Sequence, residues 1–133
     1  MLKPAGIENA KDLVSTAYLK DPSDAAWAND PEMKDFMAFF EKTFPGGNAD
    51  IATSAAAYSI AATMEQVLRQ CGDNLTRENV MSQAANLKNF RAPLLLPGIT
   101  INTSASDYYP LEQLQLMKFD GQTWVRFGDV ISP

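Results

Sequence analysis

The side chains that could carry out chemistry are few in this chain of 133 residues, which has one cysteine, Cys71, and no histidine. Ser–His and Cys–His catalysis are therefore excluded within the chain, as are an internal disulfide and a zinc site of cysteine and histidine. The carboxylates of Glu112, Asp120 and Asp129 could be imagined as an acid–base pair. Asp120 is better explained by a turn, and we expect the other two to face water. The sequence thus predicts no catalytic residue, no metal site and no cofactor.

Cys71 is best explained as part of a helix predicted over about residues 52–71. It lies at the end of an apolar stripe with helical spacing, and Gly72 fits the left-handed position that follows a helix end. The stripe comprises Ile60, Met64, Val67, Leu68 and Cys71. A reactive thiol needs a cationic neighbour or a helix N-terminus, whereas Cys71 is at the opposite end. We therefore interpret Cys71 as a small buried apolar residue.

The composition is that of a globular domain with net negative charge. Hydrophobic residues make up 46% and charged residues 20% of the chain, and the formal net charge is −5. The 11 lysines and arginines are scattered, whereas nucleic acids and anionic membrane surfaces need clustered cations. No apolar run reaches the roughly 18 residues of a membrane span, and MLKPAGIENAK lacks the apolar core of a signal peptide. We therefore predict no nucleic-acid partner and no membrane span.

Two further helices are predicted around the alanine-rich helix. One begins after Asp30, which can cap it, with Pro31 at its first position, and residues 45–47 end it. Its apolar face comprises Met33, Phe36, Met37, Phe40 and Phe44. The last helix begins at Thr76, a suitable N-cap. The small side chains between them, in residues 52–63, allow close packing against a sheet or another helix.

Strands are predicted on either side of the helices. Residues 12–19 read as a strand without an obvious partner nearby, so it is an unpaired edge unless the C-terminal hairpin or another chain pairs with it. Ile99 and Ile101 alternate with polar neighbours and predict a short strand.

The end of the chain predicts a β-hairpin. Asp120–Gly121 suits a two-residue turn, which places Met117 opposite Trp124 and Leu116 opposite Val125. Both faces of this hairpin carry apolar side chains, so both need cover from other structure.

Four segments of the chain, in order, resemble a known family. They are KPAGIENAKDLVSTAYLKDP, QCGDNLTRENVMSQAANLK, LLLPGITINTS and LQLMKFDGQTW. Together they look like the C-terminal part of type I periplasmic solute-binding proteins related to leucine/isoleucine/valine-binding protein, which serve ABC importers. The resemblance covers essentially the whole chain. It implies an α/β fold in which this chain is roughly the last third of a two-lobed protein, built as a strand, three helices, a strand and a C-terminal β-hairpin.

The resemblance also implies how the chain is divided between lobes. Residues 1–20 and 113–133 correspond to the second lobe, and residues 30–104 to the first. Residues 21–29 and 105–112 correspond to crossovers between the lobes. In that arrangement, the strands that neighbour residues 12–19 lie in an earlier part of the longer protein.

The site residues that the resemblance implies are few, because most ligand contacts in the family lie earlier in the chain. The family often places an aromatic side chain facing the cleft just before the alanine-rich helix, and this position falls near Thr53. Thr53 and Asp50 are therefore the cleft-side candidates for ligand binding, although both also suit helix caps. The aromatic residues Trp27, Tyr108 and Tyr109 fall in or beside the crossovers, where they line a cleft or cover a hinge.

The function that the resemblance implies is solute binding without chemistry. The expected ligand is a small organic solute, such as a branched-chain amino acid or an aromatic or aliphatic carboxylate. The expected partner is the membrane permease of an ABC transporter, and the expected location is the periplasm, with the signal peptide outside this chain. Two alternatives stay open: a ligand-sensing receptor module, and a stand-alone protein that dimerises through its unpaired strand and hairpin.

Overall fold

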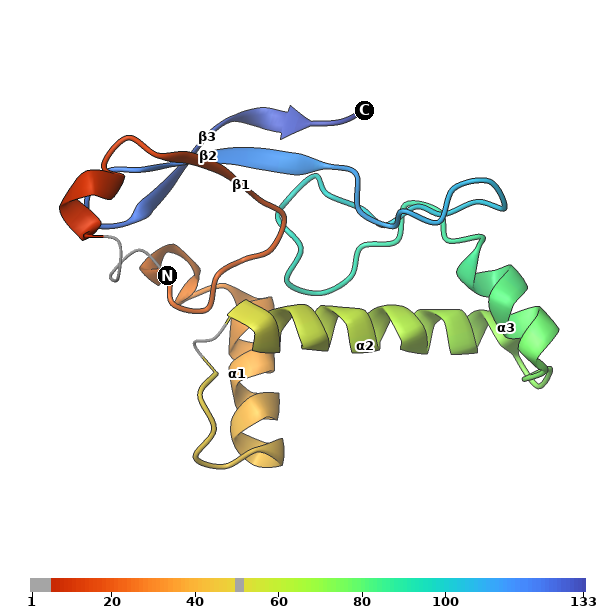
Figure 1. The fold of residues 1–133 in the computed structure, drawn as a ribbon. Coiled ribbons are helices and arrows are strands. Elements are labelled where there is room, and N and C mark those ends of the chain that lie inside the picture. Colours follow the sequence, from red (N-terminus) through yellow and green to blue (C-terminus); the bar gives the residue numbers. More distant parts are fainter. Residues whose placement is uncertain (1–5, 50–51) are drawn as a thin grey trace.

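The computed structural model describes residues 6–49 and 52–133 as a small antiparallel sheet beside three helices (Figure 1). The helices are α1 (Pro31–Thr43), α2 (Ala52–Cys71) and α3 (Arg77–Ala84), and the strands are β1 (Val14–Ala17), β2 (Leu114–Phe119) and β3 (Trp124–Ile131). Two 3₁₀ turns, η2 (Ile7–Ala10) and η3 (Ala25–Trp27), complete the elements. The long helix α2 runs beside the coil that joins α3 to the sheet, and α1 projects away from the sheet.

The three helices form where local signals predicted them. The Asp30 carboxylate accepts a hydrogen bond from the Met33 amide at 3.0 Å, and the Thr76 side chain caps α3 in the same way. Gly72 follows α2 with a φ of 56°, the left-handed conformation that glycine tolerates best. The free thiol of Cys71 is buried, which confirms its interpretation as an apolar core residue.

The apolar stripes of the helices are only partly covered. On α1, Met33 and Phe36 are buried, whereas Phe44, which directly follows the helix, is 68% exposed. On α2, Val67 is buried, but Ile60 is 69% exposed. Helical spacing therefore marked the apolar faces correctly, although much of each face lies open in the described part of the chain.

The strand predicted over residues 12–19 is shorter, Val14–Ala17, and its partner is the C-terminal hairpin. The sheet has the order β1-β2-β3, and β1 pairs antiparallel with β2 so that Val14 lies opposite Lys118. The sequence left two partners open for this strand, the hairpin or another chain, and the structure shows the hairpin. The other edge of β1 has no neighbouring strand among the described residues.

The two-residue turn predicted for the hairpin is wrong. The loop is Asp120–Thr123, because the Asp120 carboxylate accepts hydrogen bonds from the amides of Gln122 and Thr123 at 2.7 and 2.8 Å. Phe119 thus pairs with Trp124, and Met117 lies opposite Arg126. Leu116 likewise lies opposite Phe127 instead of Val125. The observed pairing differs from the predicted one by two residues. Because side chains alternate between faces with a period of two, each side chain stays on the face of the hairpin that the predicted pairing gives it.

The strand predicted at Ile99 and Ile101 is also wrong. Both side chains are buried, but the backbone is irregular and Ile101 forms only an isolated bridge with Phe90. The Ile99 amide donates to the Leu96 carbonyl within a turn, at 3.1 Å, and Gly98 has a φ of 86°. The alternation therefore reflects burial in a coil. This coil holds much of the core, which comprises Val67, Leu87, Ala92, Leu95, Leu96, Ile99 and Ile101.

Candidate ligand cleft

A cavity of about 750 Å³, here called the ligand cleft, lies between the sheet and the start of α2. Its walls come from five parts of the chain: Ile7 of η2, the end of β1, the segment from Lys20 to Trp27, the first two turns of α2, and the hairpin. The larger or polar side chains in its lining include Tyr18, Lys20, Trp27, Thr53, Met117, Trp124 and Arg126.

The hairpin supplies one wall through strand alternation. Met117 and Phe119 on β2, and Trp124 and Arg126 on β3, lie opposite one another on the same face of the sheet. Phe119 is buried, and its ring centroid lies 5.4 Å from that of Trp124. This aromatic contact stabilises the wall that also carries Arg126.

Trp27 forms the opposite wall and is held from several sides. It ends η3, whose first turn is capped because the Asp24 carboxylate accepts from the Ala26 amide at 2.9 Å. Its ring packs against both apolar cores of the protein. Two cations approach this ring: the Lys20 Nζ lies 5.1 Å from its centroid, and the Arg126 Cζ lies 4.2 Å from it. These distances suit cation–π attraction.

An ionic network under the cleft holds Lys20 in place. The Lys20 side chain is 3% exposed, and its Nζ donates to Asp30 Oδ2 and Glu32 Oε2, both at 2.8 Å. Glu32 also pairs with Arg91. A buried ammonium group is tolerated only when it is paired in this way. Lys20 therefore has its charge balanced within the protein.

The same network sets the acidity of its carboxyl groups. Burial raises the pKa of Asp30, but hydrogen bonds from Lys20 and the Met33 amide outweigh it, so that the pKa lies below its usual range. Burial likewise raises the pKa of Glu32, and the stronger opposing effect of Arg91 and Lys20 lowers it. Both groups therefore stay ionised well into the acid range.

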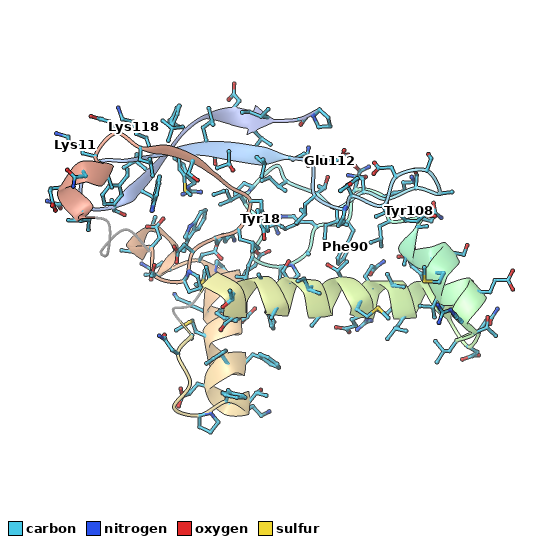
Figure 2. The ribbon with its side chains drawn as sticks, viewed as in Figure 1. Lys11, Tyr18, Phe90, Tyr108, Glu112 and Lys118 are labelled. Atoms are coloured by element: carbon cyan, nitrogen blue, oxygen red, sulfur yellow. The ribbon has the colours of Figure 1, made fainter. Side chains whose placement is uncertain are left out.

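Backbone hydrogen bonds tie this region to the core. The Lys20 amide donates to the Leu94 carbonyl at 2.8 Å, and the Leu96 amide donates to the Tyr18 carbonyl at 2.9 Å. Figure 2 shows Tyr18 on the chain that leaves the sheet towards α2. The segment that joins the sheet to the helices, which lines the cleft, is thus anchored to the core.

The sequence-predicted site residues have separate outcomes. Thr53 lies exposed in the first turn of α2 and lines the ligand cleft, whereas Asp50 lies outside the described residues. Trp27 lines the same cleft, but Tyr108 lines a different hollow and Tyr109 is 77% exposed.

Two residues of the cleft were missed by the sequence analysis. No sequence pattern marked Lys20 as a site residue, because its partners Asp30 and Glu32 lie in another segment. Arg126 follows Trp124 by two residues, and strand alternation alone could have placed it on the same face.

The carboxylates considered for acid–base chemistry lie elsewhere. Glu112 and Asp129 are exposed, as expected, and the Asp120 carboxylate is engaged by its loop. The amides of Thr123 and Gln122 hold the pKa of Asp120 below its usual value. Within residues 6–49 and 52–133, Asp, Glu and Cys side chains form no group of three that could hold a metal ion.

A second hollow, here called the apolar groove, has a volume of about 410 Å³ and lies between α2, α3 and the coil near Tyr108 (Figure 2). Ile60, Met64 and Met81 form much of its wall, and none of its lining residues is charged. The groove meets the ligand cleft at Tyr18, Leu19 and Ala56, which line both.

Comparisons with known proteins bear on the fold of the chain. No protein-family model matches the chain, and no curated protein matches it. A solved structure does: a branched-chain amino acid ABC transporter from Thermus thermophilus with bound valine, which is 15% identical in sequence. The match covers 99% of this chain and 36% of that one, with a TM-score of 0.66. The chain therefore has the fold of part of that structure. It spans about a third of the length of that structure.

A membrane-spanning helix, long and apolar enough to cross a bilayer, does not occur among the helices of the described residues.

Proposed function

We propose that this chain forms part of a solute-binding protein and binds a small organic solute in the ligand cleft without chemical conversion. The observation that carries this proposal is the cleft itself, in which polar and aromatic groups from four segments line one cavity. The likeness of the fold to a branched-chain amino acid ABC transporter with bound valine supports the same class of ligand. Branched-chain amino acids and aliphatic or aromatic carboxylates are therefore the solutes to test first.

The wider role that we propose follows from that likeness. The solute-binding protein delivers its ligand to the membrane permease of an ABC importer and works in the periplasm. Residues 1–20 and 113–133 belong to one lobe, residues 30–104 to the other, and residues 21–29 and 105–112 to the crossovers. A receptor that senses the same solute would use the same cleft, and the proteins bound outside the cleft would distinguish the two.

Tryptophan fluorescence is a direct test of solute binding. The chain has two tryptophans, and both line the ligand cleft. Titration with L-valine, L-leucine and 3-methylbutanoate is expected to change the emission with saturation. Glycine serves as the control, because it lacks the apolar side chain. Emission that stays unchanged at millimolar concentrations of every solute would overturn the proposal.

A second candidate function, self-association, is favoured by one observation. The outer face of the sheet, opposite the ligand cleft, exposes apolar side chains: Val14 is 53%, Val125 49% and Phe127 42% exposed. Such a face is a surface for a second copy of the chain or for another polypeptide. Sedimentation velocity tests this: a dimer that Val125→Lys dissociates would support it, and a monomer at high concentration would exclude it.

A further inference from the structure

The charges around the ligand cleft are not equivalent, because most of them are already engaged by the protein. Lys20 is held between Asp30 and Glu32. Asp21 accepts from the backbone and hydroxyl groups of Ser23, at 2.8 and 2.7 Å. Asp24 accepts from the amide of Ala26. Each of these groups thus has at least one protein partner.

Arg126 differs from them. Within the described residues, its guanidinium group has no carboxylate among its hydrogen bonds or ion pairs, and its contact is the Trp27 ring at 4.2 Å. Stacking on an aromatic face leaves the in-plane N–H donors of a guanidinium free. The side chain is half-buried and lines the ligand cleft.

The start of α2 is a second feature that favours an anion. Ala52 and Thr53 line the same cleft at the N-terminal end of a helix of 20 residues. A helix N-terminus carries a partial positive charge and attracts anions. Arg126 and the helix end therefore favour the same charge on a ligand.

We propose that Arg126, stacked on Trp27, is the anion subsite of the ligand cleft and anchors the carboxylate of the solute. The matching ligand is a simple branched aliphatic carboxylate, for which an α-amino group is not required, because the carboxylate alone meets the cation of Arg126. This proposal deepens the proposed solute binding and rests on it. Arginine suits the task because its planar donors can hold a carboxylate through two parallel hydrogen bonds.

The test compares three probes of matched shape on the full chain: 3-methylbutanoate, its neutral amide 3-methylbutanamide, and L-valine, which is the acid with an α-amino group. Tryptophan fluorescence gives each affinity. We expect the acid to bind about tenfold or more tightly than the amide, as a charge-assisted hydrogen bond implies, and at least as tightly as valine. Higher salt is expected to weaken the acid more than the amide.

Variants then locate the effect. Arg126→Gln is expected to weaken the acid about tenfold while leaving the amide unchanged, and Arg126→Lys to recover part of the loss. Arg69→Gln is the matched control, because Arg69 is paired with Glu65 on the exposed side of α2. Circular dichroism checks that each variant folds, and the comparison of acid with amide on the unaltered chain does not depend on any variant.

The outcomes separate this inference from the proposal beneath it. Equal affinity for acid and amide would overturn the anion subsite and leave solute binding intact. An acid preference that persists in Arg126→Gln would overturn the role of Arg126. Much tighter binding of valine than of 3-methylbutanoate would overturn the ligand class. Failure of all three probes to bind would overturn solute binding as well.

Discussion

The ligand cleft and the apolar groove meet at Tyr18, Leu19 and Ala56, yet their walls are built differently. In the cleft, ion pairs, a cap and aromatic contacts fix charged and polar groups in place. In the groove, long apolar side chains such as Met64 and Met81 line a space without any charged residue. A hollow recognises a polar solute only when its polar groups are held in advance. The groove is better suited to cover by an apolar polypeptide.

The largest effect is expected from a substitution that removes the ionic network under the cleft. Lys20→Met leaves Asp30 without its buried partner, and we expect the free energy of unfolding to fall by about 3 kcal/mol. Urea unfolding followed by circular dichroism measures it. Arg69→Met is the control, because its pair with Glu65 is exposed and worth at most about 0.5 kcal/mol. A Lys20 variant as stable as this control would show that the network does not support the cleft.

A smaller effect is expected from acid. Because the pKa values of Asp30 and Glu32 are lower in the folded protein than in the unfolded chain, their stabilisation is complete above the unfolded values of about 4. It is lost as the pH falls through the folded values. Stability should therefore be flat between about pH 5 and 7 and decline below about pH 4, with a shallower decline in Glu32→Gln. An identical acid slope in the two proteins would contradict the assignment.

The position of the solute can be tested with two neighbouring residues of α2. Thr53 lines the ligand cleft, whereas Ser54 lines a separate hollow beside α1. We expect Thr53→Ala to weaken solute affinity about fivefold, the value of one neutral hydrogen bond, and Ser54→Ala to leave it unchanged. Fluorescence titration measures both. Equal effects in the two variants would mean that Thr53 does not contact the solute.

The smallest effect belongs to the groove. Ile60 and Met64 are 69% and 46% exposed, so that Ile60→Gln and Met64→Gln should change the free energy of unfolding by less than about 0.5 kcal/mol. Solute affinity should not change, whereas binding of the dye 8-anilinonaphthalene-1-sulfonate should fall. A loss of solute affinity in these variants would place the ligand in the groove instead.

The accuracy of the sequence-based predictions depended on the range of the interactions involved. Helix ends depend on neighbouring residues, and the caps at Asp30 and Thr76 and the glycine at Gly72 were therefore confirmed. The hairpin loop was wrong because one side chain, Asp120, holds two amides and lengthens the loop. Ile99 and Ile101 were read as a strand, since burial in a coil can give the same alternation as a strand.

The candidate site was predictable only in part, for the same reason. Thr53 and Trp27 could be proposed from a family resemblance and from a loop aromatic. The stacking of Arg126 on Trp27, and the pairing of Lys20 with Asp30 and Glu32, join residues from separate segments. No local pattern encodes such contacts, because the fold brings their partners together.

The central claim is that the ligand cleft, and not the apolar groove, holds the solute. Its most direct test is a two-dimensional ¹H–¹⁵N NMR titration of the full chain with 3-methylbutanoate. We predict shifts at the indole N–H groups of Trp27 and Trp124 and at the backbone amide of Thr53, with no shift at Met64 or Met81. Shifts confined to the two methionines, or no shifts at all, would contradict the claim.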